Sequence, residues 1–407
     1  MTARLEDRFA LERPAVARSL ATAYYMIVFA TVLLVALGLM MVVSSHAVDA
    51  LAKDESPWAT AWQQVAFIAA GAAIGFALSR VPNRAWLGLT WIAFAATAAF
   101  QAIVVLGAGI SAGGNTNWLR VGPFTFQPAE FLKYGLAMWL ANVLANKARR
   151  LDDWRALIWP ALVGVVGALG LVAAGHDAGT ASIVAIMALG ALIIAGVPWR
   201  KIAVIGLGAG LGAATLILTS DNRRERVRVL FNPGDVEQFS EGWQVRQASY
   251  ALAEGGWFGQ GLGASRVKWE WLSQADTDFI FAVVGAELGL LGCLVVLILF
   301  GVLAVGLFQV VRLHPNRFCQ IAVGAFTCWL LGQAIVNIGM VIQVLPVVGV
   351  PLPFVSSGGS ALIACLGAIG TVLGLLRNDP TVGPSLRARR GVVARAFGVF
   401  ARGGHPR

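Results

Sequence analysis

The residues from Gly242 to Gly292 decide how the chain is organised, and they read GWQVRQASYALAEGGWFGQGLGASRVKWEWLSQADTDFIFAVVGAELGLLG. The first part is polar and punctuated by glycine, which is typical of a loop. The part that begins at Asp278 is mostly apolar and long enough to span a membrane. Placing a carboxylate at the water-facing end of an apolar helix is costly, so Asp278 is a candidate functional residue.

The composition indicates a membrane protein. The chain has 407 residues, of which 58% are hydrophobic and 13% are charged, and its mean hydropathy is +0.74. A soluble domain carries about 25% charged residues. In a soluble protein the net charge of +10 could indicate a nucleic-acid partner, but in a membrane protein it reports loop topology and anionic lipid. We therefore expect no nucleic acid as a partner.

Apolar runs of membrane-spanning length predict an all-α polytopic membrane protein with about ten transmembrane helices. We expect one membrane domain over residues 21–377, an N-terminal tail over 1–20, a basic tail over 378–407 and one long loop over 220–277. The eighth run is longer than a bilayer needs and should tilt or protrude. The expected spans fall near residues 21–43, 62–79, 85–108, 128–147, 157–174, 180–198, 201–219, 278–311, 318–343 and 355–377.

Positive charge in the short loops predicts the orientation of the chain. An even number of spans puts both termini on one side, and cytoplasmic loops carry the excess of Lys and Arg. The short loops on the N-terminal side hold two or more basic residues each, whereas those on the other side hold only Lys53 and Arg120. We therefore expect both termini in the cytoplasm and the loops at 109–127, 220–277 and 344–354 outside it.

The first polar cluster surrounds Gln127 and Pro128, where proline pre-sets the start of a helix. Glu130 lies in the first turn of that helix, and Lys133 lies three residues later on the same face. One interpretation is an internal pair whose charges neutralise each other inside the bilayer. The other is that Lys133, together with Arg120, supplies positive charge to an anionic substrate.

Acidic residues stand at two further helix entrances, where capping is the simplest interpretation. Asp177 opens the sixth span, and capping is the role we expect there. Asp276 stands just before the eighth span and Asp278 in its first turn, and for both residues capping and a functional role are equally open. Lys268 and Glu270 lead into this acidic pair.

The long loop contains a segment from Trp243 to Ser249 that could form an amphipathic helix, with Gln244 and Gln247 on one face. The glycines that follow, between Gly255 and Gly263, are expected to bring the backbone close to another part of the molecule. They do not form a nucleotide-binding loop, because no strand and helix flank them.

The residues from Leu345 to Ser360 include three prolines and a pair of glycines at membrane depth. Broken backbone is tolerated there only where protein buries it or where it lines a cavity, so this segment predicts a pocket. From the residues alone, a protein that handles a lipid-linked anion fits these clusters, and an ion-coupled transporter fits nearly as well.

These clusters, in this order, resemble the SEDS family (shape, elongation, division and sporulation) of membrane proteins. The resemblance covers about residues 110–377 and rests on FQPAEFLK at 126–133, DTDFIFAVVGAELG at 276–289 and PLPFVSSGGS at 351–360. The stretch from Gly242 to Gly263 and the serines of the last motif are more similar to the division branch, FtsW, than to the elongation branch, RodA.

The resemblance implies a peptidoglycan glycosyltransferase of the bacterial plasma membrane that works at the division septum. It would polymerise lipid II outside the membrane, with inversion at the anomeric carbon and with Asp278 as general base. The implied partners are a class B penicillin-binding protein and other membrane proteins of the division machinery. Contacts to lipid II are expected from Arg120, Glu130, Lys133, Gln244, Arg246, Gln247, Lys268, Glu270, Ser356 and Ser357, with the basic residues as candidates for holding its diphosphate.

Several alternatives stay open, namely a RodA-like elongation polymerase, a lipid II flippase and a scaffold that recruits the penicillin-binding protein. Asp276 stands where the family usually has His, and Asn117 and Ser357 also depart from the usual residues, which affects the substrate contacts expected there. The acids could hold Mg²⁺ or Mn²⁺, although no dedicated metal cage is apparent. The four cysteines lie in apolar stretches and indicate neither disulfides nor a metal site.

Overall fold

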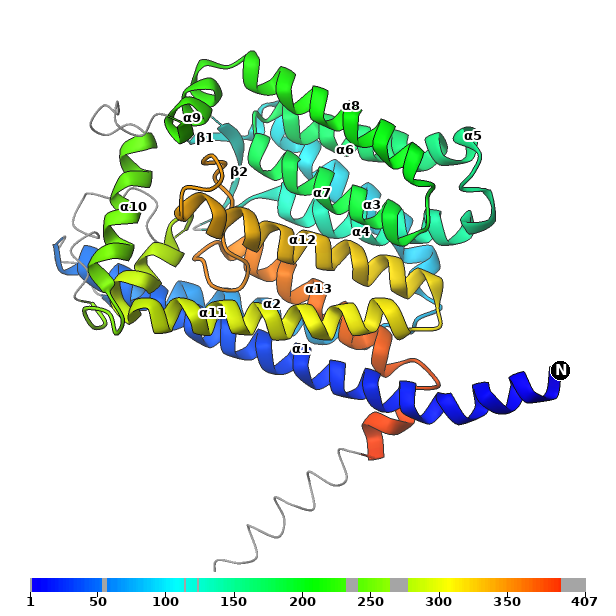
Figure 1. The fold of residues 1–407 in the computed structure, drawn as a ribbon. Coiled ribbons are helices and arrows are strands. Elements are labelled where there is room, and N and C mark those ends of the chain that lie inside the picture. Colours follow the sequence, from blue (N-terminus) through cyan, green and yellow to red (C-terminus); the bar gives the residue numbers. More distant parts are fainter. Residues whose placement is uncertain are drawn as a thin grey trace, which may run out of the picture.

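The computed structural model describes residues 2–52, 57–112, 115–122, 124–231, 241–263 and 277–388. Helices make up most of these residues (Figure 1). The helices are α1 (Thr2–Ala52), α2 (Pro57–Ser79), α3 (Trp86–Ile103), α4 (Pro128–Asn146), α5 (Trp154–Leu157), α6 (Val163–Ala174), α7 (Ala178–Ile194), α8 (Trp199–Leu218), α9 (Asp221–Phe231), α10 (Glu241–Gly255), α11 (Ile280–Leu313), α12 (Arg317–Val341) and α13 (Gly359–Arg377). Short π-helical turns follow α3 and α5 (Val104–Ala108 and Ile158–Leu162), and a 3-10 turn (Ala148–Arg150) follows α4.

Each predicted span contains a helix, and the fifth is divided into α5 and α6 near Pro160, which cannot continue the helical hydrogen bonds. In the part of the chain that the structure describes, eight helical segments are long and apolar enough to cross a membrane. The two spans outside this group are α7, which has 17 residues, and α4, which carries Glu130 and Lys133. The predicted all-α polytopic architecture is confirmed.

The centre of the bundle is formed by α12 and α13. α12 packs against α4, α7 and α11, and α13 packs against α2 and α4. α1 lies along α11 and α2. By contrast, α8 lies at the edge, where Lys201 is its one buried residue, so most of its apolar surface is open to lipid.

The predicted loop at 109–127 contains a small antiparallel sheet, which the all-α prediction did not include. Its strands β1 (Ile110–Ala112), β2 (Asn115–Val121) and β3 (Phe124–Phe126) pair in chain order. Burial alternates along β2, as the two-residue period of a strand requires, with Leu119 buried and Arg120 exposed. The sheet therefore covers the bundle with one face and meets solvent with the other.

The predicted loop at 220–277 contains two helices, α9 and α10. α10 includes the segment from Trp243 to Ser249, so the amphipathic helix expected there is confirmed. α10 packs against α11, which gives its apolar residues a surface on which to bury.

α11 is broken close to its start. The length of this span predicted a tilted or protruding helix, but Gly289 interrupts it with φ 68° and ψ −165°, a conformation that is essentially restricted to glycine. The break separates a short rod, residues 280–288, from the longer remainder of the helix. The excess length is thus divided between two pieces.

The two ends of the bundle differ. The sheet, α9 and α10 gather at one end, here called the sheet end, whereas the start of α1 and the end of α13 lie at the other end (Figure 1). The first span therefore starts, and the last span ends, at the same end of the bundle, as an even number of crossings requires. The membrane face on which each end lies, and the tails at 1–20 and 378–407, stay predictions.

Candidate active site

Four spanning helices, α4, α7, α11 and α13, begin at the sheet end, and hydrogen bonds join their starts. Before α4, the main-chain N–H of Gln127 donates to the Ser360 hydroxyl of α13 (3.1 Å), and the Gln127 side chain donates to Asp177 before α7 (2.8 Å). Before α13, the Ser356 hydroxyl donates to the carbonyl of Thr277, which precedes α11 (2.6 Å). The positive ends of four helix dipoles therefore lie together, an environment that favours an anion.

Asp177 is the N-cap of α7, as predicted. Its carboxylate accepts from the main-chain N–H of Thr180 (2.9 Å) and from that residue's hydroxyl (2.8 Å). It also accepts from Asn117 of β2 (2.9 Å) and from Gln127. Asp177 is buried, and its oxygens are engaged in fixing β2 and α4 to the start of α7.

Asp278 lies in the turn that precedes α11, although we predicted that the span begins at residue 278. Phe279 occupies the N-cap position and makes no capping hydrogen bond through its side chain. Asp278 is therefore not the N-cap residue. It is half-buried, and a Cβ added to Gly349 would lie 3.4 Å from its Oδ2, so the carboxylate lies against the proline-rich broken segment.

The main chain around Asp278 is fixed by side chains from two other elements. The Asn337 amide of α12 donates to the carbonyl of Asp278 (2.8 Å) and to the carbonyl of Val350 (2.7 Å). Ser356 donates to the carbonyl just before Asp278 and accepts from the N–H of Leu352 (2.8 Å). These bonds tie the turn and the broken segment to each other and to α12.

A second amide of α12, Gln333, connects the broken segment to the predicted ion pair of α4. Its Nε2 donates to the carbonyl of Pro351 (2.8 Å), and its Oε1 accepts from Lys133 (2.8 Å) and Trp329 (3.0 Å). Lys133 also lies 2.7 Å from Glu130, and both side chains are 1% exposed. This is the geometry of the internal pair, and a contact of either residue with substrate stays a prediction.

The remaining predicted contact residues differ in placement. Gln247 of α10 is buried, and Gln244 and Arg246 are half-buried, with the Arg246 guanidinium 5.0 Å from the ring of Trp243. Arg120 is exposed on β2, opposite Thr125 of β3, and Ser357 is half-buried next to Ser356. Lys268, Glu270 and Asp276 lie outside the described residues, so their roles stay predictions.

Sequence reasoning missed Gln333, Asn337 and Glu287, which are all buried. Each is a polar residue within an apolar helix, and such residues face the bundle interior and make specific contacts. Gln333 and Asn337 are also four residues apart, which places them on one face of α12. This spacing is the signal that could have found them.

No group of three or more His, Cys, Asp or Glu side chains that could hold a metal ion occurs among the residues that the structure describes. The four cysteines are free. The requirement for Mg²⁺ or Mn²⁺ stays open, because the acids at positions 270 and 276 lie outside the described ranges.

Comparison with known proteins supports the resemblance. The FtsW/RodA/SpoVE family, described as cell cycle proteins, matches residues 24–380. The probable peptidoglycan glycosyltransferase FtsW of Mycobacterium tuberculosis is 37% identical over 370 residues, which cover 91% of this chain and 70% of that protein. Stage V sporulation protein E of Bacillus subtilis is 32% identical over 355 residues, which cover 86% of this chain and 96% of that protein.

Two solved structures have a similar fold. A chain from a study of the structural coordination of polymerization and crosslinking by a peptidoglycan synthase complex gives a TM-score of 0.72 at 27% identity, covering 86% of this chain and 96% of that one. The rod shape determining protein RodA of Thermus thermophilus gives 0.63 at 26% identity, covering 86% and 95%. With the family match over residues 24–380, these likenesses show that the chain belongs to the FtsW/RodA/SpoVE family of cell cycle proteins.

Proposed function

We propose that this chain is a peptidoglycan glycosyltransferase that polymerises lipid II at the outer face of the bacterial plasma membrane. One observation carries this proposal: the half-buried carboxylate of Asp278 lies where the starts of four spanning helices meet. The names of the relatives, probable peptidoglycan glycosyltransferases among them, support the class of reaction.

The proposed chemistry is an inverting transfer. The 4-hydroxyl of the acceptor sugar attacks the anomeric carbon of the donor, and the bond from that carbon to the lipid diphosphate breaks. Asp278 takes the hydroxyl proton as general base. Asn337 and Ser356 fix the main chain that carries this carboxylate before the substrate arrives, which lowers the entropic cost of reaction.

The leaving diphosphate needs positive charge. The four helix starts supply partial positive charge at the sheet end without any titratable group. We propose that the cationic side chains of Arg120, Arg246 and Lys268 bind the diphosphate. Further contacts to lipid II come from Gln244, Gln247, Glu270, Ser356 and Ser357. Lys133 and Glu130 act on the site indirectly, because Gln333 accepts a hydrogen bond from Lys133 and donates one to the carbonyl of Pro351.

A class B penicillin-binding protein is the proposed partner, since a similar chain comes from a complex that coordinates polymerization and crosslinking. We place the protein at the division septum, with other division membrane proteins, because an FtsW is 37% identical over most of the chain. The RodA likeness keeps the elongation role as the second candidate.

Purified protein with its penicillin-binding partner tests this function on lipid II. Formation of long glycan chains that a muramidase digests would support the polymerase. Lipid II that crosses vesicle membranes without forming glycan would instead identify a flippase. Loss of glycan with EDTA and its recovery with Mg²⁺ or Mn²⁺ would establish the metal requirement that the sequence leaves open.

A further inference from the structure

The short rod of α11, residues 280–288, joins two features that the proposed mechanism does not connect. Asp278 lies just before its start, and Glu287 lies at its end. Glu287 is 1% exposed, and a buried carboxylate is costly unless hydrogen bonds or charges compensate it. The break at Gly289 means that the longer part of α11 does not by itself fix the direction of this rod.

The glycine-rich loop at 255–263 fills the break. Its backbone replaces helical hydrogen bonds that the break removes. In the loop, the main-chain N–H groups of Gln260 and Gly261 donate to the carbonyls of Ala286 (2.9 Å) and Glu287 (3.1 Å). In α11, the main-chain N–H groups of Leu290 and Leu291 donate to the loop carbonyls of Gly256 (2.9 Å) and Trp257 (3.3 Å). Only glycine fits the contact, because a Cβ on Gly259 would lie 2.0 Å from the Glu287 carbonyl. This is the close approach that the glycines predicted.

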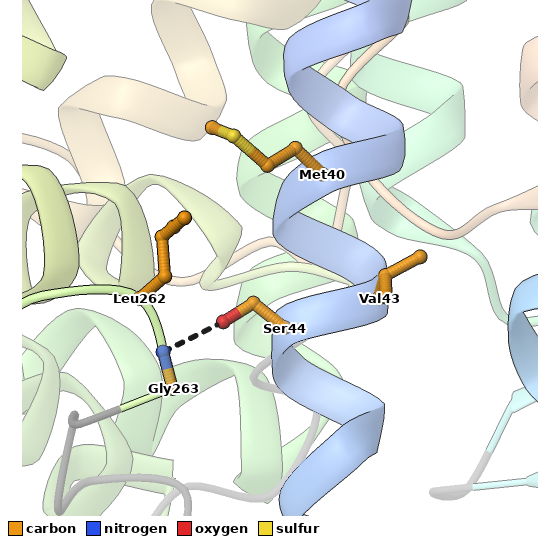
Figure 2. A pocket seen from close by; sticks show the side chains of 5 residues that line it. All are labelled: Met40, Val43, Ser44, Leu262 and Gly263. Atoms are coloured by element: carbon orange, nitrogen blue, oxygen red, sulfur yellow. Dashed lines mark hydrogen bonds between the residues drawn. The ribbon is translucent and has the colours of Figure 1, made fainter. Parts of the chain in front are cut away.

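The Glu287 carboxylate joins this loop to α1. One oxygen accepts from the Ser44 hydroxyl of α1 (2.7 Å), and the other accepts from the N–H of Gly263 (3.2 Å). The same N–H also lies 3.0 Å from the Ser44 hydroxyl oxygen (Figure 2). Three segments that are far apart in the sequence thus meet at one carboxylate.

Two members of this contact, Ser44 and Gly263, also form the polar corner of a pocket of about 410 Å³. Its other walls are apolar and come from Met40 and Val43 of α1 and from Leu262 of the loop (Figure 2). Because Glu287 is itself 1% exposed, the hydrogen bonds of its carboxylate are screened less by water than those of an exposed one.

We propose that Glu287 is a positioning residue for Asp278: it locks the rod that follows Asp278 to α1 and to the glycine-rich loop. The proposal rests on the proposed function. The rod is about 14 Å long at 1.5 Å per residue. Asn337 and Ser356 hold its start and Glu287 holds its end, so releasing the end lets the rod pivot about its start and turns the Asp278 carboxylate out of its orientation. A displacement of about 1 Å costs roughly a hundredfold in rate.

The test compares Glu287→Gln and Ser44→Ala with Ser45→Ala. The control removes a neighbouring α1 hydroxyl that is buried without a hydrogen-bond partner. We expect kcat for glycan synthesis to fall about ten- to hundredfold in the first two variants, with little change in KM, and to stay unchanged in the control. The double variant should be no slower than Glu287→Gln alone, because both changes break the same contact.

Hydrogen exchange supplies a readout that does not depend on activity. The amides of Gln260, Gly261 and Leu290 should exchange faster in Glu287→Gln and Ser44→Ala, while amides in α12 keep their protection. Unchanged exchange at these three amides, or an unchanged kcat in both variants, would overturn the proposal. If Glu287→Gln does not fold, Ser44→Ala alone decides. If the wild type makes no glycan, the proposed function fails. Faster loop exchange in the two variants would then still show that Glu287 locks the rod, without any role of that lock in glycan synthesis.

Discussion

Asn337 provides the sharpest test of how the structure holds Asp278. Replacing it with leucine keeps the approximate shape of the side chain and removes both donors. The carbonyls of Asp278 and Val350, which accept at 2.8 and 2.7 Å, then lose their partners. Each unsatisfied buried carbonyl costs about 1–3 kcal/mol.

One effect opposes this loss. The Asn337 Oδ1 is itself buried without a hydrogen-bond partner, and removing it returns about 1–3 kcal/mol. The net destabilisation of Asn337→Leu is therefore roughly 1–3 kcal/mol. The catalytic effect should be larger, about ten- to hundredfold in kcat, because the turn that carries Asp278 loses a direct anchor.

The assay measures glycan synthesis and thermal unfolding of Asn337→Leu beside Thr327→Val. The control lies in the same helix, is also buried, and loses only a hydroxyl bond to the carbonyl of Val323 in its own helix. Asn337→Leu with a kcat within twofold of the wild type, at any stability, would refute the argument that α12 positions Asp278.

Further predictions concern stability. Lys133→Met or Glu130→Gln alone should destabilise the protein by about 3–5 kcal/mol, because each leaves an unpaired buried charge; thermal unfolding in detergent should show a smaller loss for the double variant, and an equal loss would contradict the pairing. Gly259→Ala should expose the loop to protease, because its Cβ would lie 2.0 Å from the carbonyl of Glu287; wild-type resistance would argue against this contact. Between α11 and α12, burial lowers the pKa of His314 below 6.5, and a neighbouring carboxylate opposes the shift only in part. The unfolded state then binds the proton first, so stability should be constant above about pH 6.5 and decline below it, and this decline should be weaker in His314→Gln.

The sequence predicted the spans and the capping role of Asp177 because both depend on local patterns. Hydropathy marks a helix that crosses lipid, and an acidic residue just before a helix commonly caps its N-terminus. The sequence could not show that Lys133 faces Gln333, since these residues are 200 positions apart. It therefore left the internal pair and the substrate contact as alternatives.

The break in α11 was hidden for a related reason. Gly289 lies in an apolar run that reads as one continuous span, and its conformation depends on backbone donors and acceptors from residues 256–261. The role of Asn337 was hidden because its partners are main-chain carbonyls, which every residue possesses. Patterns of side chains do not identify such partners, although a buried amide in a spanning helix signals that partners exist.

The rate of glycan synthesis by Asp278→Asn tests the central claim most directly. The variant, purified with its penicillin-binding partner, should keep the unfolding temperature of the wild type and bind lipid II. It should polymerise lipid II about 10²- to 10⁴-fold more slowly, because the general base is lost. Polymerisation at the wild-type rate would contradict the assignment of Asp278 as the base.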